Sequence, residues 1–209
     1  VSGEMKETFL RLPAEKRERI MDACIKEFSD RGYEAGATDR IIEQAGISKG
    51  GLYEYISSKR ELFLYTVEYS YRRLYGYLTQ RILDESIRVP NDLIERLRIM
   101  SELAIDFYIA DPRYVQLLAT TYRMNDTDMQ NHIQRVFQEL FLELFGDVDE
   151  EFLRFRKQRL LEFAMWLLFK TRFDFLVFYK ESGDMEKTKA LYMDRWEFYL
   201  ELMKHGIYR

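Results

Sequence analysis

The chain has 209 residues, which is enough for one large helical domain or for a small domain docked on a larger one. Its three prolines, ten glycines and single cysteine favour a helical fold that no intrachain disulfide stabilises. The formal net charge of −4 excludes a uniformly basic, nucleic-acid-binding surface, so any such function must depend on a local group of residues.

The first predicted helix lies between Ala14 and Arg31. Ile20, Cys24 and Phe28 recur every four residues, so they form one apolar face of this helix. Gly32 follows directly, at a position where a left-handed C-cap is expected. The pattern therefore predicts that the first helix ends there.

Two short helices are predicted next, each with an apolar face at spacings of three and four residues. Thr38 offers a hydroxyl to cap the first of them, and Gly46 ends it. Ser48 offers the cap for the second. Two short helices that meet at a glycine-containing turn are typical of a helix-turn-helix motif, which we place at residues 37–56.

A long helix is predicted after this motif. The run Ser58-Lys59-Arg60-Glu61 has the pattern of a capping box, and one apolar stripe continues from it to about Leu83. Hydrophobic spacing then predicts five more helices, so the fold class is all-α with about nine helices. These five are placed near residues 90–110, 112–124, 126–145, 149–181 and 184–205.

Residues 32–63, with the sequence GYEAGATDRIIEQAGISKGGLYEYISSKRELF, resemble the DNA-binding signature of the tetracycline-repressor (TetR-type) family. The resemblance covers roughly residues 14–63, which we interpret as a three-helix DNA-binding domain. Residues 64–209 resemble the family in length and helicity, and we interpret them as the regulatory and dimerisation domain. The resemblance implies a bacterial transcription regulator that binds double-stranded, pseudo-palindromic operator DNA as a homodimer. We expect a repressor, with activation as the alternative.

The chemistry of this stretch suits contacts with DNA. Lys49 can neutralise a phosphate or reach a guanine edge, and the hydroxyls of Ser48 and Thr38 can donate to phosphate oxygens. Taken one at a time, such residues are equally explained as helix caps, solvated charges and core, and Tyr55 is expected to be at least partly structural. The predicted DNA-binding residues are Thr38, Arg40, Ser48, Lys49, Gly50, Gly51, Tyr53, Tyr55 and Lys59.

The paired glycines have two expected effects. Gly50 and Gly51 permit a close approach of the backbone to DNA. They also cost the second short helix about 1 kcal/mol each in helix propensity, so this helix is expected to become firmer on the operator.

In the family that the chain resembles, the C-terminal helices dimerise and enclose a ligand pocket, and the ligand changes the spacing of the two DNA-reading heads. We expect dimerisation through the helices at 149–181 and 184–205 and a small, mostly apolar effector. Core packing explains most of the candidate pocket residues equally well, and Glu162 is either a polar anchor or a solvated carboxylate. The candidates are Phe107, Tyr108, Tyr122, Phe137, Phe141, Glu162, Met165, Trp166, Phe169 and Phe173.

Other functions find less support in the sequence. Cys24 lies on an apolar face, His132 and His205 are far apart, and no glycine loop suits a phosphate, so we expect no enzyme, metal site or cofactor. The first 13 residues lack the apolar core of a signal peptide and no apolar run is long enough for a membrane span, so a cytoplasmic protein is expected. The alternative is a helical protein-interaction adaptor without sequence-specific DNA binding.

Overall fold

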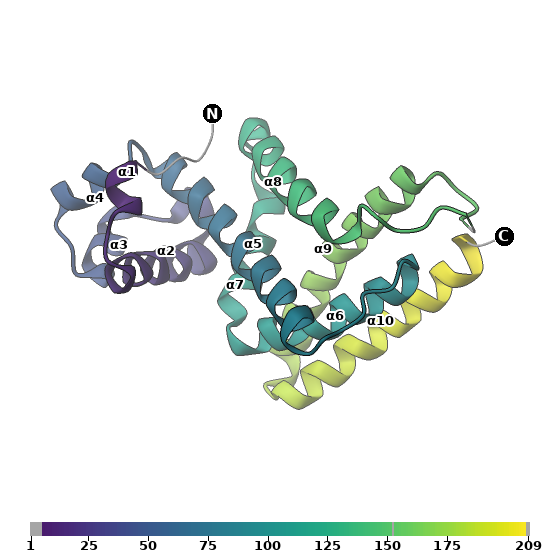
Figure 1. The fold of residues 1–209 in the computed structure, drawn as a ribbon. Coiled ribbons are helices and arrows are strands. Elements are labelled where there is room, and N and C mark those ends of the chain that lie inside the picture. The colour runs from purple at the N-terminus through teal and green to yellow at the C-terminus, as the bar shows by residue number, and fades with distance from the viewer. Residues whose placement is uncertain (1–5, 152, 208–209) are drawn as a thin grey trace. The chain divides into compact units, whose positions relative to one another are not determined.

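The structure is a computed structural model, and it describes residues 6–151 and 153–207 (Figure 1). The described residues form helices and no strand, as the sequence predicts. None of these helices is both long enough and apolar enough to cross a membrane. The elements are α1 (Glu7–Leu10), α2 (Ala14–Ala35), α3 (Thr38–Ala45), α4 (Lys49–Tyr55), α5 (Lys59–Asp84), α6 (Leu93–Ala110), α7 (Pro112–Thr120), the 3-10 turn η1 (Thr121–Arg123), α8 (Thr127–Phe145), α9 (Lys157–Ser182) and α10 (Met185–Ile207).

The chain divides into two compact units. The first comprises Val1–Arg72 and Arg113–Phe137, and the second comprises Arg73–Pro112 and Gln138–Arg209. Helices α5 and α8 each contribute residues to both units. The hydrophobic pattern of the sequence does not indicate that α7 and the first part of α8 group with the N-terminal helices.

Helix α2 supplies the core of the first unit. Ile20, Cys24 and Phe28 on its predicted apolar face are each 0% exposed. The Phe28 ring meets the Phe63 ring of α5 edge to face, with centroids 5.1 Å apart. Burial raises the pKa of the Cys24 thiol to about 12, although a hydrogen bond with Thr66 acts in the opposite direction.

The junction between α2 and α3 depends on two glycines. Gly32 has a φ of +68°, the left-handed conformation that the sequence predicts, but the chain kinks there and stays helical to Ala35. Gly36 then passes close to α2, because a Cβ at this position would lie 2.7 Å from the Gly32 carbonyl oxygen and 2.8 Å from the Phe28 ring. Only a residue without a side chain fits this turn without displacing its neighbours.

The caps of the two short helices match the predictions at two of three positions. Gly46 is left-handed, with a φ of +62°, and ends α3. The Ser48 hydroxyl accepts a hydrogen bond of 3.0 Å from the Gly51 amide and caps α4. The prediction for Thr38 is wrong, because Thr38 is the first residue of α3 and the N-cap is Ala37, whose side chain cannot accept a hydrogen bond.

The capping box at the start of α5 forms, but one of its two hydrogen bonds involves a different residue from the one predicted. The Ser58 hydroxyl accepts a 3.2 Å hydrogen bond from the Glu61 amide. The Glu61 carboxylate accepts from the amide of Ser57 rather than from that of Ser58. Both bonds satisfy backbone donors that a helix start leaves without partners.

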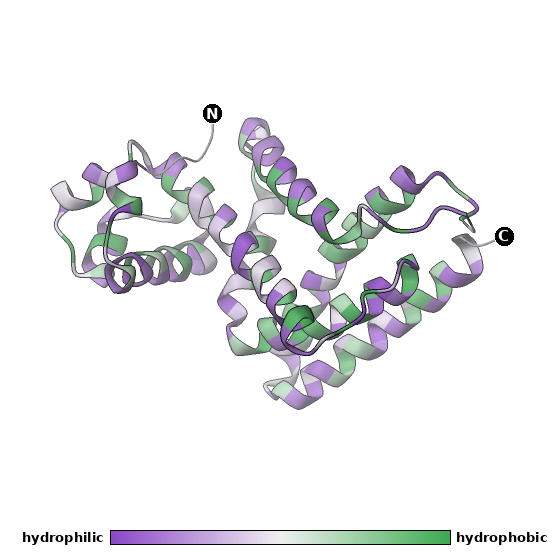
Figure 2. Cartoon of the chain, viewed as in Figure 1, coloured by the Kyte–Doolittle hydropathy of each residue, from purple (hydrophilic) through white to green (hydrophobic). Residues whose placement is uncertain are grey.

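In the second unit, α10 packs against α6 and α9. Figure 2 shows hydrophobic and hydrophilic residues alternating along α10, as expected of a helix with one buried face. Trp196 and Tyr192 of this helix are 0% and 1% exposed and form part of the core. The Arg98 guanidinium of α6 joins Glu197 of α10 at 2.8 Å.

Helix α9 begins later than the sequence predicts, at Lys157 instead of near residue 149. The preceding segment is used as a connection, in which the Asp149 amide donates to the Asn91 carbonyl at 2.9 Å. Nearby, the buried Arg96 guanidinium bonds the Leu144 carbonyl at 2.8 Å and the Asp147 carboxylate. These contacts hold the chain after α8 in a non-helical conformation.

Candidate nucleic-acid interface

The predicted DNA-binding residues all lie in the first unit, on α3, on α4, in the turn between them and, for Lys59, at the start of α5. Lys49 stands at the start of α4 and is exposed, as is Tyr53, which is 41% exposed. The Lys49 amine lies 3.2 Å from the Asp39 carboxylate, and both side chains are more than two-thirds exposed. Such a solvent-screened pair is weak, so the lysine can exchange this partner for a phosphate.

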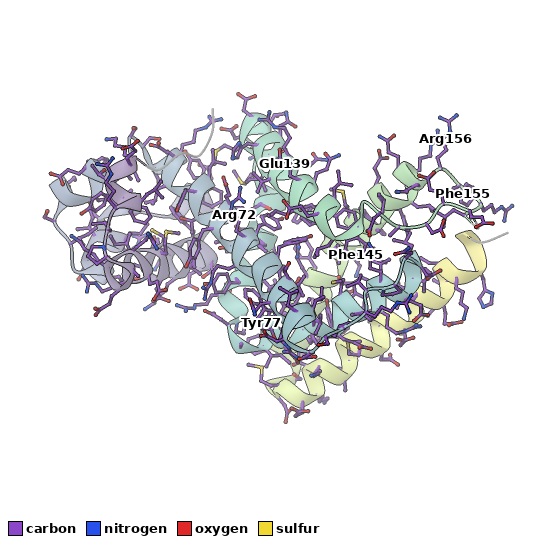
Figure 3. All side chains as sticks on the ribbon, viewed as in Figure 1. Arg72, Tyr77, Glu139, Phe145, Phe155 and Arg156 are labelled. Carbon is purple, nitrogen blue, oxygen red and sulfur yellow. The ribbon has the colours of Figure 1, made fainter. Side chains whose placement is uncertain are left out.

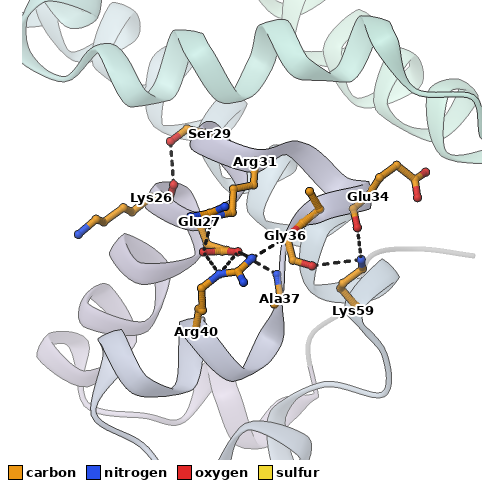
Figure 4. A network of polar contacts seen from close by, with 10 residues as sticks. Lys26, Glu27, Ser29, Arg31, Glu34, Gly36, Ala37, Arg40 and Lys59 are labelled. Atoms are coloured by element: carbon orange, nitrogen blue, oxygen red, sulfur yellow. Dashed lines mark hydrogen bonds and ion pairs between the residues drawn. The ribbon is translucent and has the colours of Figure 1, made fainter.

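The Arg40 side chain forms hydrogen bonds with other groups of the protein (Figure 4). Its Nε and Nη2 donate to the carboxylate of Glu27 on α2 at 2.9 and 2.6 Å, and Nη2 also donates to the Ala35 carbonyl at 2.8 Å. The Ala37 amide donates to the same carboxylate at 2.9 Å. Glu27 therefore joins both the first turn of α3 and the residue before it to α2. A DNA contact by Arg40 stays a prediction.

The Glu27 carboxylate is charged at neutral pH although the residue is only 3% exposed. Burial raises its pKa, but the hydrogen bonds from Arg40 and Ala37 and the nearby Arg31 outweigh burial and hold the pKa below the usual glutamate value. Sequence reasoning missed this residue. The available signal was an acidic residue seven positions after Ile20, on the apolar stripe of α2.

Lys59 is also occupied by protein groups. Its amine donates to the carbonyls of Glu34 and Gly36, both at 3.2 Å, and lies 4.6 Å from the centroid of the Tyr33 ring. A cation suits the carbonyl-rich end of α2. Tyr55 is 6% exposed and packs against Phe9 with ring centroids 5.9 Å apart, so it has the structural role expected of it.

The two glycines of α4 differ in their surroundings. A Cβ on Gly50 would meet no atom within 4 Å, whereas a Cβ on Gly51 would lie 3.1 Å from the Ser48 hydroxyl. No contact with a described residue therefore requires glycine at position 50. A close approach to DNA would supply such a requirement.

The predicted ligand-binding residues are distributed over both units. Tyr122 and the buried Phe137 belong to the first unit, and the other eight belong to the second. Tyr108 is buried against Phe175 at 5.5 Å, while Trp166 is 57% exposed. Neighbouring residues of a helix point about 100° apart, so Met165 and Trp166 lie on different sides of α9 although both fit the predicted face.

A hollow of about 500 Å³ lies in the second unit, beside the start of α9. Glu162 and Met165 line it, and they are the two predicted ligand-binding residues that do so. Arg156 belongs to its lining, and its side chain points away from the ribbon (Figure 3). The full lining is Gln138, Leu142, Gly146, Glu150, Arg156, Lys157, Gln158, Leu161, Glu162 and Met165.

Helices α9 and α10 also carry large apolar side chains that remain exposed in the single chain. Phe163 and Trp166 stack with ring centroids 5.6 Å apart. Folded monomers do not commonly expose so many large apolar residues on two adjacent helices. We call these residues the apolar face of α9 and α10: Phe163, Trp166, Val177, Leu191, Phe198 and Leu202, which are 37–60% exposed.

The capped pair α3 and α4, braced by α2 and followed by the long α5, defines a helix-turn-helix protein. Residues 20–66 match the model of the family described as bacterial regulatory proteins, tetR family. Residues 20–66 therefore form a domain of the TetR-family type, as the resemblance in the sequence predicts.

One of two similar proteins is a transcriptional activator, and the other is a negative regulator. The HTH-type transcriptional activator FasR of Mycolicibacterium smegmatis is 35% identical over 109 residues, which are 52% of this chain and 48% of FasR. The chain thus matches about half the length of that relative. The negative regulator of the biofilm operon icaADBC, IcaR of Staphylococcus epidermidis, is 23% identical over 86% of this chain and 94% of its own length.

A solved structure extends the similarity of fold beyond the helix-turn-helix. The transcriptional regulator FadR of Bacillus subtilis, in complex with stearoyl-CoA, superposes with a TM-score of 0.67 at 14% identity. The superposition covers 86% of this chain and 95% of FadR. At this identity the likeness concerns the fold alone.

Proposed function

We propose that the chain is a ligand-responsive repressor that binds a pseudo-palindromic operator as a homodimer. The observation that carries the proposal is the family match over residues 20–66. Within these residues, Ser48 caps α4, and Lys49 and Tyr53 of this helix are exposed. The similarity to IcaR along most of both chains favours repression over activation. We also propose that the protein is located in the cytoplasm.

The homodimer would form through the apolar face of α9 and α10. Large apolar anchors such as Trp166 and Phe198 are the residues that carry binding energy in stable interfaces. A two-fold dimer would place two copies of α4 in successive major grooves, about 34 to 36 Å apart.

The effector would be mostly apolar with an anionic group. The lining of the hollow beside α9 includes the apolar Leu161 and Met165 and the cationic Arg156 and Lys157. It also includes Glu162 and Glu150, and the Glu150 carboxylate lies 3.5 Å from the Lys157 amine. An acyl chain would suit the apolar side chains and an anionic carrier the two cations, and the FadR structure holds stearoyl-CoA. Such an effector would release DNA if it bound better to a conformation with the wrong head spacing, with a coupling of about 1–3 kcal/mol.

Ion pairs within the first unit offer a route for this coupling. Arg113 of α7 lies 2.8 Å from Asp22 of α2, and Arg60 of α5 lies 3.0 Å from Asp126 before α8. Movements of α7 or α8 would therefore reach the helices that brace α3 and α4.

Fluorescence anisotropy tests the DNA-binding part of the proposal. A duplex is selected from a random pool with the unaltered chain and compared with a scrambled duplex at several salt concentrations. We expect the chain to prefer the selected duplex, and the logarithm of its binding constant to fall linearly with the logarithm of the salt concentration. Lys49→Met should make this negative salt slope shallower by about 1, because one phosphate contact is lost. Lys204→Met on α10 is the control. Equal, feeble binding to all duplexes would support the protein-interaction adaptor instead.

The effector site is tested by titrating acyl-CoA thioesters into the complex with the selected duplex. We expect long acyl chains to release DNA, and a double substitution of Arg156 and Lys157 by alanine to weaken the response. Arg154→Ala, which removes a neighbouring cation outside the hollow, is the control. No release by any acyl-CoA, or equal loss in the control, would exclude this effector class.

A further inference from the structure

The N-terminal helix α1, which sequence reasoning missed, packs against α4. Three hydrogen bonds join the two segments although they are more than 40 residues apart in the chain. The Lys6 amine donates to the Tyr53 carbonyl at 2.9 Å, and the Lys6 backbone amide donates to the Tyr55 carbonyl at 3.0 Å. The Thr8 hydroxyl donates to the Glu54 carbonyl between them at 2.8 Å.

These three acceptors are the last carbonyls of α4. The final carbonyls of a helix have no partner within that helix and must find water, a cap or another segment. The positive charge of Lys6 also suits the negative end of the helix dipole. Residues 6 to 8 therefore act as a C-terminal cap that is supplied from a distant part of the sequence.

Helix α4 has reason to need such support. It has only seven residues, and two of them are glycines with poor helix propensity. Helices of this length are not stable in isolation and depend on contacts with the rest of the protein.

Phe9 anchors the capping segment. It is 0% exposed, and its ring lies 5.9 Å from the Tyr55 ring of α4 and 5.7 Å from the Tyr65 ring of α5. Arg17 of α2 also donates to the Leu10 carbonyl at 3.1 Å. The segment is thus fixed to α2 and α5 at one end of α1 while its polar groups hold α4.

We propose that residues 6–10 form an N-terminal clasp that holds α4 in the orientation that reads DNA, with Lys6 and Thr8 as positioning residues. This inference rests on the proposed function for its consequence in DNA binding. Lys6 and Thr8 act through the carbonyls of α4, so their loss loosens α4 without removing a DNA contact.

Thr8→Val tests the clasp, because valine keeps the shape of threonine and removes the hydroxyl. Lys6→Met removes the amine, Thr8→Ser keeps a hydroxyl and should behave as the unaltered chain, and Arg11→Met is the matched control. Arg11 is cationic and largely exposed, and its side chain pairs with Glu7 instead of α4. Two readouts are measured: hydrogen exchange of the amides of residues 52–56 without DNA, and affinity for the selected duplex.

For Thr8→Val and Lys6→Met we expect exchange to accelerate by roughly three- to tenfold, with a similar loss of affinity, in line with one hydrogen bond each. The salt slope should stay unchanged in both variants. Unchanged exchange in both variants would overturn the clasp. A lower salt slope for Lys6→Met with unchanged exchange would also overturn it, because Lys6 would then contact a phosphate directly.

The two readouts separate this inference from the proposed function. If the unaltered chain selects no duplex, the proposed function fails, while the exchange measurement still decides whether the clasp exists. If the duplex is selected and Thr8→Val binds it as well as the unaltered chain does, the clasp has no role in DNA binding.

Discussion

Arg40 and Glu27 form the ionic contact that fastens α3 to α2, with two guanidinium nitrogens on one nearly buried carboxylate. The same carboxylate accepts the Ala37 amide at the start of α3, where no side chain provides a cap. The orientation of α3 therefore depends on a charged residue of another helix. Stability of the first unit should change with the protonation of that residue.

Replacing Glu27 by glutamine should destabilise the chain by about 1–3 kcal/mol at neutral pH, because the buried hydrogen bonds lose their charged acceptor. The pKa of Glu27 is lowered in the folded chain, so its stabilisation is present above the unfolded glutamate pKa of about 4.3 and is lost as pH falls through the folded value. Urea unfolding as a function of pH measures this, and Glu27→Gln should show a shallower loss of stability in acid. The exposed Glu34→Gln is the control, and parallel profiles for Glu27→Gln and the unaltered chain would contradict the prediction.

Gly36→Ala should destabilise the chain by about 1–3 kcal/mol, since the added methyl group would overlap the Gly32 carbonyl and the Phe28 ring. Gly76→Ala in α5 is the matched control, because its Cβ would meet no atom within 4 Å. Helix propensity should then stabilise the control by up to about 1 kcal/mol. Thermal or urea unfolding compares the two, and equal effects would show that the turn at Gly36 adapts.

Gly50→Ala should change stability and DNA affinity in opposite directions. The free protein has room for the methyl group, so helix propensity should stabilise α4 by up to about 1 kcal/mol. If the backbone of α4 approaches DNA closely, the same methyl group should weaken binding to the selected duplex. Unfolding and anisotropy measurements on one preparation test both parts, and unchanged or higher affinity would remove Gly50 from the DNA-binding set.

Phe198→Glu should shift the chain from dimer to monomer, because it places a charge in the apolar face of α9 and α10. Leu83→Glu near the end of α5 is the control, since Leu83 is 66% exposed and Phe198 is 56% exposed. Analytical ultracentrifugation gives the oligomeric state. If both variants remain dimeric, the dimer interface lies outside the apolar face of α9 and α10.

Sequence reasoning succeeded where local residues determine the structure. Gly46 was predicted to end α3 and Ser48 to cap α4, and both do so. Each of these residues acts on backbone groups only a few positions away in the sequence. The Glu27 contact and the clasp at Lys6 involve partners 10 to 49 residues away, which spacing in one helix cannot indicate. The sequence therefore did not indicate that Arg40 and Lys59, which were predicted to contact DNA, also bind groups of the protein itself.

The later start of α9 has a similar cause. Residues 149–156 have enough apolar and charged residues to continue a helical pattern, but the Asp149 amide bonds to Asn91. The division of the candidate ligand residues also follows from packing, because a helical face about 100° wide includes both a buried Met165 and an exposed Trp166. Which side of such a face meets the core is decided by neighbouring helices.

The burial of Cys24 has a practical consequence for studying the protein in solution. A thiol that is 0% exposed and whose pKa is about 12 has almost no reactive thiolate at neutral pH. Maleimide or methanethiosulfonate reagents should therefore leave the natural cysteine unmodified. Spin labels attached through Glu43→Cys, at an exposed position of α3, could then report the distance between the two DNA-binding units of the proposed homodimer, without first removing Cys24.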